Sequence, residues 1–535
     1  MKKVMKKVIK KVNSKIANSK RKSFLSFWFC VFMVCSSIST VKAELKPDFA
    51  IKGFHLDLKC QVMTMPALRA FAKELSEMGI NTLVMEYEGS FPFTKHATLS
   101  NKYAFTREEV KSFVSYCTSL GIDVIPLQNC FGHVEYILRH NRYANIKEDN
   151  KEVSQVCPMK EEECKAVFTE IFSEIIELHP SKYLFIGGDE TFLLGNCKLC
   201  AAKVAKEGKS KLFVDYVKLM CEVARSLGKI PVLWADILLK NPEAASELPK
   251  DAIFVDWNYG WDKNHFGNID NLLQLGINMW GAPAIRSSPD NIYLTQWNVH
   301  FNNISTYVPA SRELGYKGMI MTSWSTGGTY GFTYDAGWEV VNMQQIRNVY
   351  PISGFRILVA AYGESLKNTS VSLNTEAFVV DYGQKRFGFT AAESALLWQI
   401  LNSPQEIVKG KKEKTAKEVS AMKDGAIALQ KQMSTLKPKT NQKEFEHLRL
   451  MLDIRVQYLD FKEIEMRYQS PEFNRNLAKK YVQQLEPLIT ESKNIDKRFI
   501  NLNKGFLHDE ELLEINHIRN EKLYIMYATV KRLTI

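Results

Sequence analysis

Two adjacent carboxylates, Asp189 and Glu190, follow two glycines at the end of a short apolar run. The run, Tyr183–Ile186, has the aromatic and β-branched composition of a buried strand. Successive side chains of a strand point to opposite faces, so both carboxylates reach one pocket only where the backbone curls, as Gly187 and Gly188 permit. Cleavage of a glycosidic bond uses a carboxylate pair whose pKa values are held apart. The alternative is a solvated turn, because Gly, Asp and Thr are also common in loops.

Polar and aromatic side chains also follow the other apolar runs of the first 324 residues. These residues are Asp57, Lys59, Glu86, Glu88, Asn129, His133, Trp234, Asp236, Trp257, Tyr259, Trp280 and Trp324. Carboxylates bind hydroxyl groups and indole rings stack on sugar faces, so the set predicts a sugar pocket. Each residue also has a purely structural interpretation. In that interpretation His133 is a hydrogen-bonded core histidine, and Trp280 or Trp324 fills the interior of the barrel.

Eight strand-like runs, separated mostly by amphipathic helices, must position these side chains. The predicted strands are Ile51–Leu58, Asn81–Tyr87, Asp123–Gln128, Tyr183–Ile186, Ile230–Ala235, Ile253–Trp257, Ile277–Gly281 and Gly318–Ser323. The predicted helices include Pro66–Met78, Arg107–Leu120, Glu161–Leu178 and Lys211–Leu227. Eight such units predict an α/β fold, a (β/α)₈ TIM barrel over residues 44–345, whose strand ends gather the chemistry on one face. An open doubly wound sheet would need an early phosphate-binding glycine loop, which the sequence lacks.

Helical periodicity dominates after about residue 350, where glycine and proline become rare. The predicted helices are Ala391–Leu401, Gln405–Leu436, Lys443–Tyr468, Asn476–Ile495 and Asp509–Leu533. We therefore expect an all-helical C-terminal domain over residues 346–535, and we find no catalytic constellation in it.

The net charge of +12 belongs to the N-terminal leader. Residues 1–43 contain 11 of the 71 basic residues and no acidic residue, which leaves 60 basic against 59 acidic residues. The leader has a basic start, the apolar run Phe24–Cys35 and a small-residue site ending at Ala43, so it predicts a secretory signal and an exported chain. Lipoprotein anchoring at Cys35 is the less favoured alternative, because Val34 precedes it. No nucleic-acid partner and no later membrane span are expected.

Eight cysteines remain after the leader, and Cys197-x-x-Cys200 is their only closely spaced pair. Such a pair is half of a zinc site or a possible disulfide. Cys157 and Cys164 are candidates to complete a site, although their spacing does not require it. Unlinked cysteines are the expected state, and no metal and no cofactor are predicted for the reaction.

The Gly187–Glu190 motif on a fourth barrel strand resembles glycoside hydrolase family 20, the β-N-acetylhexosaminidases, and within it the hexosaminidase D branch. Further resemblance lies in His55–Lys59, Glu86–Glu88 with Phe91-Pro92, Phe131–His133, Leu178–Pro180 and Val232–Asp236. Gly-Gly-Asp-Glu also resembles the signature of diguanylate cyclases. Those enzymes carry an aromatic residue where this chain has Thr191 and act on cytosolic GTP, which the export signal disfavours.

The family resemblance implies a glycan substrate with a terminal N-acetylhexosamine. Glu190 would be the general acid/base, and Asp189 would orient the substrate's own acetamido group, which attacks the anomeric carbon to give an oxazolinium intermediate and net retention. Trp234, Trp257 and Trp324 would wall the acetamide. The other expected substrate-binding residues are Asp57, Glu86, His133, Asp236, Tyr259 and Trp280. The alternative function is a catalytically inactive carbohydrate-binding barrel.

Three departures from the family pattern concern sugar recognition. The family often has Trp-x-Glu on the last strand, where this chain has Trp324-Ser325-Thr326. The usual arginine for outer hydroxyls has no clear counterpart, and Lys59 or Asp57 are the candidates to replace it. Tyr259 is the nearest candidate for the tyrosine that binds the acetamide. The preference for GlcNAc or GalNAc and the oligomeric state therefore stay open.

Overall fold

The computed structural model describes residues 48–325, 349–367, 371–408 and 413–535. Residues 47–535 form one compact unit. The predicted leader lies outside the described residues. No helix within the described ranges combines the length and apolar character needed to cross a membrane.

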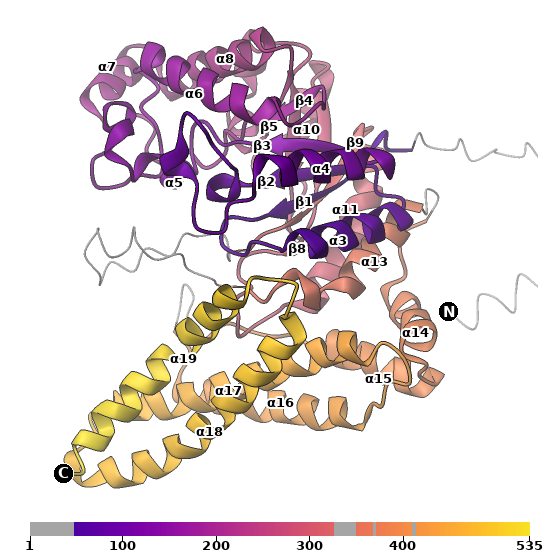
Figure 1. The fold of residues 1–535 in the computed structure, drawn as a ribbon, viewed down its shortest axis with the longest axis vertical. Helices are drawn as coiled ribbons and strands as arrows, with labels where there is room; N and C mark the ends of the chain where they lie inside the picture. The colour runs from indigo at the N-terminus through magenta and orange to yellow at the C-terminus, as the bar shows by residue number, and fades with distance from the viewer. Residues whose placement is uncertain (1–47, 326–348, 368–370, 409–412) are drawn as a thin grey trace, which may run out of the picture. The chain divides into compact units, whose positions relative to one another are not determined.

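Within the described residues, eight parallel strands close into a barrel around which helices are arranged (Figure 1). The strands are β1 (Ile51–Asp57), β2 (Thr82–Glu86), β3 (Asp123–Leu127), β4 (Tyr183–Phe185), β5 (Ile230–Trp234), β6 (Ile253–Trp257), β7 (Asn278–Ala282) and β9 (Gly318–Ser323). Each pairs with the next, and β9 returns to β1 to close the barrel. The predicted TIM-barrel fold is confirmed.

One additional short strand was not predicted. It is β8 (Ala284–Arg286), which continues the direction of β7 and pairs with the end of β9. Pro283 separates the two strands, because proline has no backbone N–H to donate to a sheet. Its carbonyl still accepts from Thr322 N at 2.8 Å.

The barrel strands are buried on both faces, which explains their nearly continuous apolar sequences. Their inward side chains form one cluster that includes Val84, Ile125, Phe185, Val232 and Trp280. Parallel register also aligns the strand ends, so that Asp57 of β1 pairs with Glu86 of β2. Polar residues at successive strand ends are thereby brought to one rim.

Helices follow the strands along the chain and cover the barrel (Figure 1). They are α3 (Met65–Glu77), α4 (Arg107–Ser119), α5 (Glu135–Leu138), α6 (Glu161–Ile176), α7 (Lys198–Glu207), α8 (Lys209–Ser226), α9 (Asp236–Lys240), α10 (Ile269–Gln274) and α11 (Trp297–Glu313). Thr106 and Glu109 form a reciprocal capping box at the start of α4. Thr64 caps α3, with Pro66 in its first turn.

Among the described residues, the chain after residue 349 is helical, as predicted. Its helices are α13 (Arg356–Lys367), α14 (Thr375–Phe387), α15 (Ala391–Leu401), α16 (Ala416–Thr435), α17 (Gln442–Tyr468), α18 (Ala478–Asn503) and α19 (Asp509–Arg532). The helix predicted from Gln405 is wrong at its start, because Thr415 and Glu418 form a capping box that begins α16 at Ala416. The predicted Asn476–Ile495 helix starts later and continues to Asn503, with Pro487 inside it.

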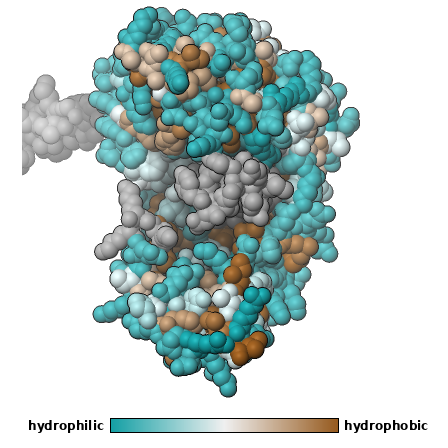
Figure 2. Space-filling model, turned by 90° about the vertical axis from the view of Figure 1, so that its left-hand side faces the viewer, coloured by the Kyte–Doolittle hydropathy of each residue, from teal (hydrophilic) through white to brown (hydrophobic). Residues whose placement is uncertain are grey.

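The helical region is anchored to the barrel near the end of β1. Glu511 of α19 accepts from Val62 N at 3.1 Å and 3.2 Å, and Thr64 donates to Gly505 O at 2.6 Å. Tyr362 of α13 lies within hydrogen-bonding distance of two barrel carbonyls. One continuous apolar cluster includes residues of both regions. The face shown in Figure 2 is mostly hydrophilic, with hydrophobic residues in small groups.

Candidate active site

A pocket of about 360 Å³ lies at the carboxyl ends of the barrel strands. Its volume falls within the usual range for small-ligand sites. The pocket is lined by Lys59, Glu86, Asn129, His133, Asp189, Glu190, Trp234, Trp257, Tyr259, Trp261, Ser287, Ser288 and Trp324. Carboxylates, a cation and aromatic rings therefore share one cavity.

The two carboxylates reach the same cavity because the backbone turns sharply after β4. Gly187 and Gly188 have φ angles of 74° and 95°, which glycine adopts without steric cost. A Cβ atom on Gly187 would lie 2.1 Å from Asn129 Oδ1, so a larger residue would also collide with the β3 loop. Glu190 itself has a φ of 46°, and such strained non-glycine backbone is concentrated at functional sites. The predicted curl of the chain is confirmed.

His133 contacts both carboxylates from the loop after β3. Its Nε2 lies 3.3 Å from Asp189 Oδ2 and 3.2 Å from Glu190 Oε2. The two loops approach closely at Gly132, where a Cβ atom would lie 2.5 Å from Asp189 O. Burial lowers the pKa of His133, but the charge of Asp189 and the hydrogen bonds with Asp189 and Glu190 outweigh burial and raise the pKa well above its usual value. The protonated ring of His133 therefore lies between the carboxylates of Asp189 and Glu190.

Asp189 lines the pocket and has one carboxylate oxygen that is buried and unpaired within the described residues. The residue as a whole is buried, and this oxygen is Oδ1. A buried acceptor without a donor is unfavourable, so a ligand donor at this position would be stabilised. An N–H group of a bound molecule fits that requirement.

Asp236 lies behind the acids, at the start of α9. Its Oδ2 accepts from Glu190 N at 3.4 Å and lies 3.6 Å from Lys240 Nζ. Burial, followed by the charge of Asp189, raises the pKa of Asp236 to about 7. A proton on Asp236 lowers the repulsion among three neighbouring carboxyl groups.

Asp236→Asn should change how stability depends on pH. A free aspartate has a pKa of about 3.9, so between about pH 4 and pH 7 the folded chain holds a proton that the unfolded chain has lost. The free energy of unfolding therefore falls as pH rises through this window, by on the order of a few kcal/mol at most. Asparagine does not titrate, so thermal unfolding from pH 5 to pH 8 should show the variant gaining stability relative to the parent. Parallel curves for the two proteins would contradict the raised pKa.

Glu86 is held by three donors on another wall of the pocket. Its oxygens lie 3.1 Å from Lys59 Nζ, 3.0 Å from Asn129 Nδ2 and 2.9 Å from His55 Nε2. Burial raises the pKa of Glu86, but the charge of Lys59 and the contacts with His55 outweigh burial and lower the pKa to about 2. Glu86 is therefore an ionised binding group whose lone pairs are largely engaged.

Five aromatic residues enclose the remaining walls. Trp234 and Trp324 lie with ring centroids 6.0 Å apart, and Trp257 lies 5.2 Å from Tyr259 and 5.6 Å from Trp261. Trp324 Nε1 donates to Tyr259 OH at 3.0 Å, which fixes both rings. Such walls suit a ligand that combines an apolar face with polar edges.

The structure places eight of the predicted site residues in the pocket. They are Asp189, Glu190, Glu86, His133, Trp234, Trp257, Tyr259 and Trp324. Asp57 lies behind the pocket, where it accepts from Ser325 N and Oγ at 2.8 Å and 2.9 Å. Asp236 is also set behind, as described above. Trp280 does not line the pocket: its ring packs inside the barrel, 5.3 Å from Tyr183.

The sequence did not predict three of the residues that line the pocket, namely Trp261, Ser287 and Ser288. Trp261 continues the two-residue spacing of Trp257 and Tyr259, which could have indicated it. Ser287 and Ser288 follow the unpredicted strand β8, and nothing in their sequence marks them. Lys59 and Asn129 were recognised only as polar residues at strand ends.

The chain is similar to known glycoside hydrolases. The profile of glycosyl hydrolase family 20, catalytic domain, matches residues 61–342, just over half of the chain. Hexosaminidase D of Bos taurus is 29% identical over 290 residues, which cover 50% of this chain and 83% of that protein. Hexosaminidase D of Homo sapiens is 30% identical over 253 residues; the match covers 45% of this chain and spans about half, 52%, of the human protein. A solved β-N-acetylhexosaminidase from Bacteroides fragilis is 18% identical, with a TM-score of 0.43 over 61% of this chain and 72% of that chain.

Proposed function

The chain belongs to glycosyl hydrolase family 20, and from this premise we propose that it is an exo-acting β-N-acetylhexosaminidase. It removes terminal β-linked N-acetylglucosamine or N-acetylgalactosamine from glycans, with retention of configuration. The observation that carries the proposal is the pairing of Asp189 and Glu190 around His133 inside an aromatic pocket.

Glu190 is the general acid and later the general base in this proposal. Its side chain is 30% exposed at the pocket, while that of Asp189 is 10% exposed. The more accessible group can reach a glycosidic oxygen. The more enclosed one, whose Oδ1 has no partner among the described residues, is suited to accept the acetamide N–H and to stabilise positive charge as it develops.

The attacking group is the substrate's acetamide oxygen rather than an enzyme carboxylate. The pocket-lining carboxylates of the described chain are Glu86, Asp189 and Glu190. Glu86 is engaged by Lys59, Asn129 and His55, which makes it a poor nucleophile. Asp189 and Glu190 are adjacent in the chain and do not face each other across a sugar ring, as the two carboxylates of a double-displacement site do. The carbonyl oxygen that attacks C1 forms an oxazolinium ring as the leaving group takes the proton of Glu190.

A panel of aryl glycosides tests this function. Aryl β-GlcNAc and β-GalNAc should be hydrolysed, whereas aryl β-glucoside should not, because it lacks the acetamide. Binding of N-acetylhexosamine without turnover of any of these substrates would favour the alternative of an inactive carbohydrate-binding barrel. The intact Asp189–Glu190 pair favours the enzyme, because a binding module does not need a proton donor beside a charge stabiliser.

We also propose that the chain is exported and that its leader is removed after Ala43. The support is the basic start, the apolar run and the small-residue site of residues 1–43. N-terminal sequencing of the exported protein should begin at Glu44. A lipid-modified N-terminus at Cys35 would contradict this and establish lipoprotein anchoring.

A further inference from the structure

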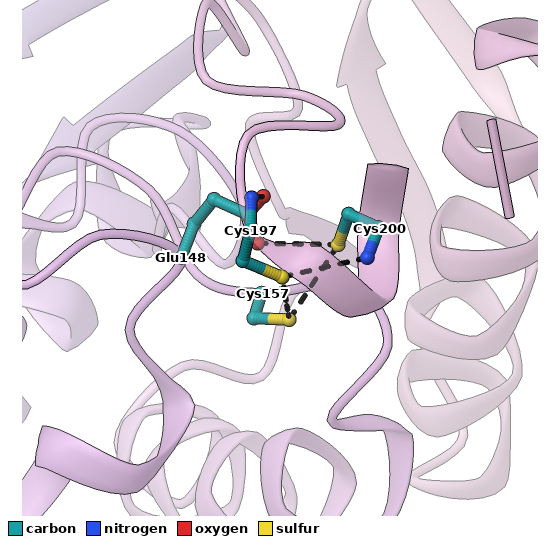
Figure 3. Close-up of side chains that lie close together, drawn as sticks. All are labelled: Glu148, Cys157, Cys197 and Cys200. Carbon is teal, nitrogen blue, oxygen red and sulfur yellow. Dashed lines mark hydrogen bonds between the residues drawn. The ribbon is translucent and has the colours of Figure 1, made fainter. Parts of the chain in front are cut away.

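A second cluster of reactive side chains lies outside the pocket and has no part in the proposed reaction. It consists of Glu148, Cys157, Cys197 and Cys200, whose ligand atoms all lie within 4.8 Å of one another (Figure 3). The cysteines are free thiols in the structure. Cys164 does not join the cluster through its sulfur, which contacts Cys157 O at 3.7 Å.

We propose that these four residues bind one zinc ion with a Cys₃Glu ligand set. Zinc binds thiolate sulfur at about 2.3 Å and carboxylate oxygen at about 2.0–2.2 Å with tetrahedral geometry, so two bound sulfurs lie roughly 3.8 Å apart. In the structure Cys157 Sγ lies 3.6 Å from both Cys197 Sγ and Cys200 Sγ. Cys200 Sγ lies 3.2 Å from Glu148 Oε2. These spacings match the edges of a zinc tetrahedron.

The burial of Glu148 is an independent indication of a cation. This carboxylate is only 4% exposed. Within the described part of the chain no basic side chain pairs with it, and its oxygens meet Cys197 N at 2.7 Å and the Cys200 thiol. A buried carboxylate without a cation is unfavourable. A zinc ion would offset part of the negative charge of this carboxylate and the thiolates, and the site would then have the same net charge as a zinc-bound Cys₄ site.

The backbone presents the four ligands from two loops. Glu148 and Cys157 come from the two sides of a short antiparallel pairing after β3, centred on Lys147 and Val156. In it Glu148 N donates to Gln155 O and Cys157 N donates to Ile146 O. Cys197 caps α7 after β4, and Cys200 N donates to Cys197 Sγ at 3.4 Å. A backbone N–H aimed at a sulfur stabilises a thiolate, so the loop is arranged for metal ligation.

The position of the cluster gives the zinc ion a structural role. The loop after β3 also carries His133, and the loop after β4 carries Asp189 and Glu190. Zinc would hold these two loops together at a point several residues along the chain from His133, Asp189 and Glu190. None of its four ligands lines the pocket. The zinc cluster and the pocket share no residue, so the zinc proposal does not rest on the proposed function.

Metal analysis of the purified full chain, grown with zinc, tests the site. We expect about one zinc per chain, little zinc in Cys157→Ser and Cys200→Ser, and release of zinc at lower chelator concentration from Glu148→Gln. Cys164→Ala is the matched control and should keep its zinc, as should Glu190→Gln. A parent chain without zinc, zinc retained in Cys157→Ser, or iron in place of zinc would overturn the proposal.

Two measurements on the parent chain keep the test decisive if a variant fails to fold. Replacement of zinc by cobalt(II) should produce the intense visible bands of a tetrahedral thiolate site. Alkylation under denaturing, non-reducing conditions with chelator should label Cys157, Cys197 and Cys200 completely. Two of these three cysteines protected as a disulfide would overturn the proposal, as would the absence of cobalt bands. Removal of zinc should also lower the unfolding temperature, and added zinc should restore it.

Discussion

Glu190→Gln should reduce turnover of N-acetylhexosaminides with poor leaving groups by roughly 10²–10⁴-fold, because it removes the proton donor. The loss should shrink for activated aryl leaving groups, which depart without protonation. Glutamine keeps the size of the side chain, so the contact with His133 is altered in charge more than in shape. The measurement is kcat/KM over a series of aryl β-GlcNAc substrates of decreasing leaving-group pKa.

The matched control is Glu135→Gln, at the start of α5 and two residues after His133. Burial raises the pKa of Glu135 to about 7, so glutamine closely mimics its protonated form, and Glu135 does not line the pocket. Its variant should show a small loss that is equal for all leaving groups. If Glu190→Gln also gave an equal loss across the series, Glu190 would not be the acid.

Asp189→Asn should lower kcat by on the order of 10²-fold or more, because it keeps the shape but removes the charge that stabilises the oxazolinium. The same stabilisation cannot operate on a substrate that lacks the acetamido group. Replacing that group with a hydroxyl should therefore nearly abolish turnover by the parent enzyme. Fluorination of the acetyl group should slow the reaction progressively, since it weakens the attacking oxygen.

An intermediate mimic and a trapping experiment complete this test. A thiazoline analogue of the oxazolinium should inhibit the parent well below the substrate KM, and Asp189→Asn should lose much of that affinity. Mass spectrometry of the enzyme after treatment with a 2-fluoro sugar should show no adduct. A covalent glycosyl group on any carboxylate would rule out the substrate-assisted mechanism.

The sequence determined the barrel and the position of Asp189 and Glu190 at the end of its fourth strand. Barrel strands are buried on both faces, so Ile253–Trp257 and Gly318–Ser323 were predicted with the bounds observed. The parallel register of a barrel gathers strand ends, which is why residues as distant as Glu86 and Trp324 could be assigned to one pocket before their positions were known. Gly187 and Gly188 also marked the backbone curl, because positive φ angles favour glycine.

Only the tertiary structure decided how each polar side chain is used. Trp234 and Trp280 both point into the barrel. Trp234 is the last residue of β5 and lines the pocket, whereas Trp280 is in the middle of β7, so its ring packs deeper in the barrel. Strand β8 was not predicted, because Pro283 interrupts the apolar run before it. Ser287 and Ser288, which follow β8, were therefore not predicted either. The loop of Glu148 and Cys157 meets Cys197 and Cys200 only through three-dimensional packing, since short-range spacing carries no information about contacts between residues 40 or more positions apart.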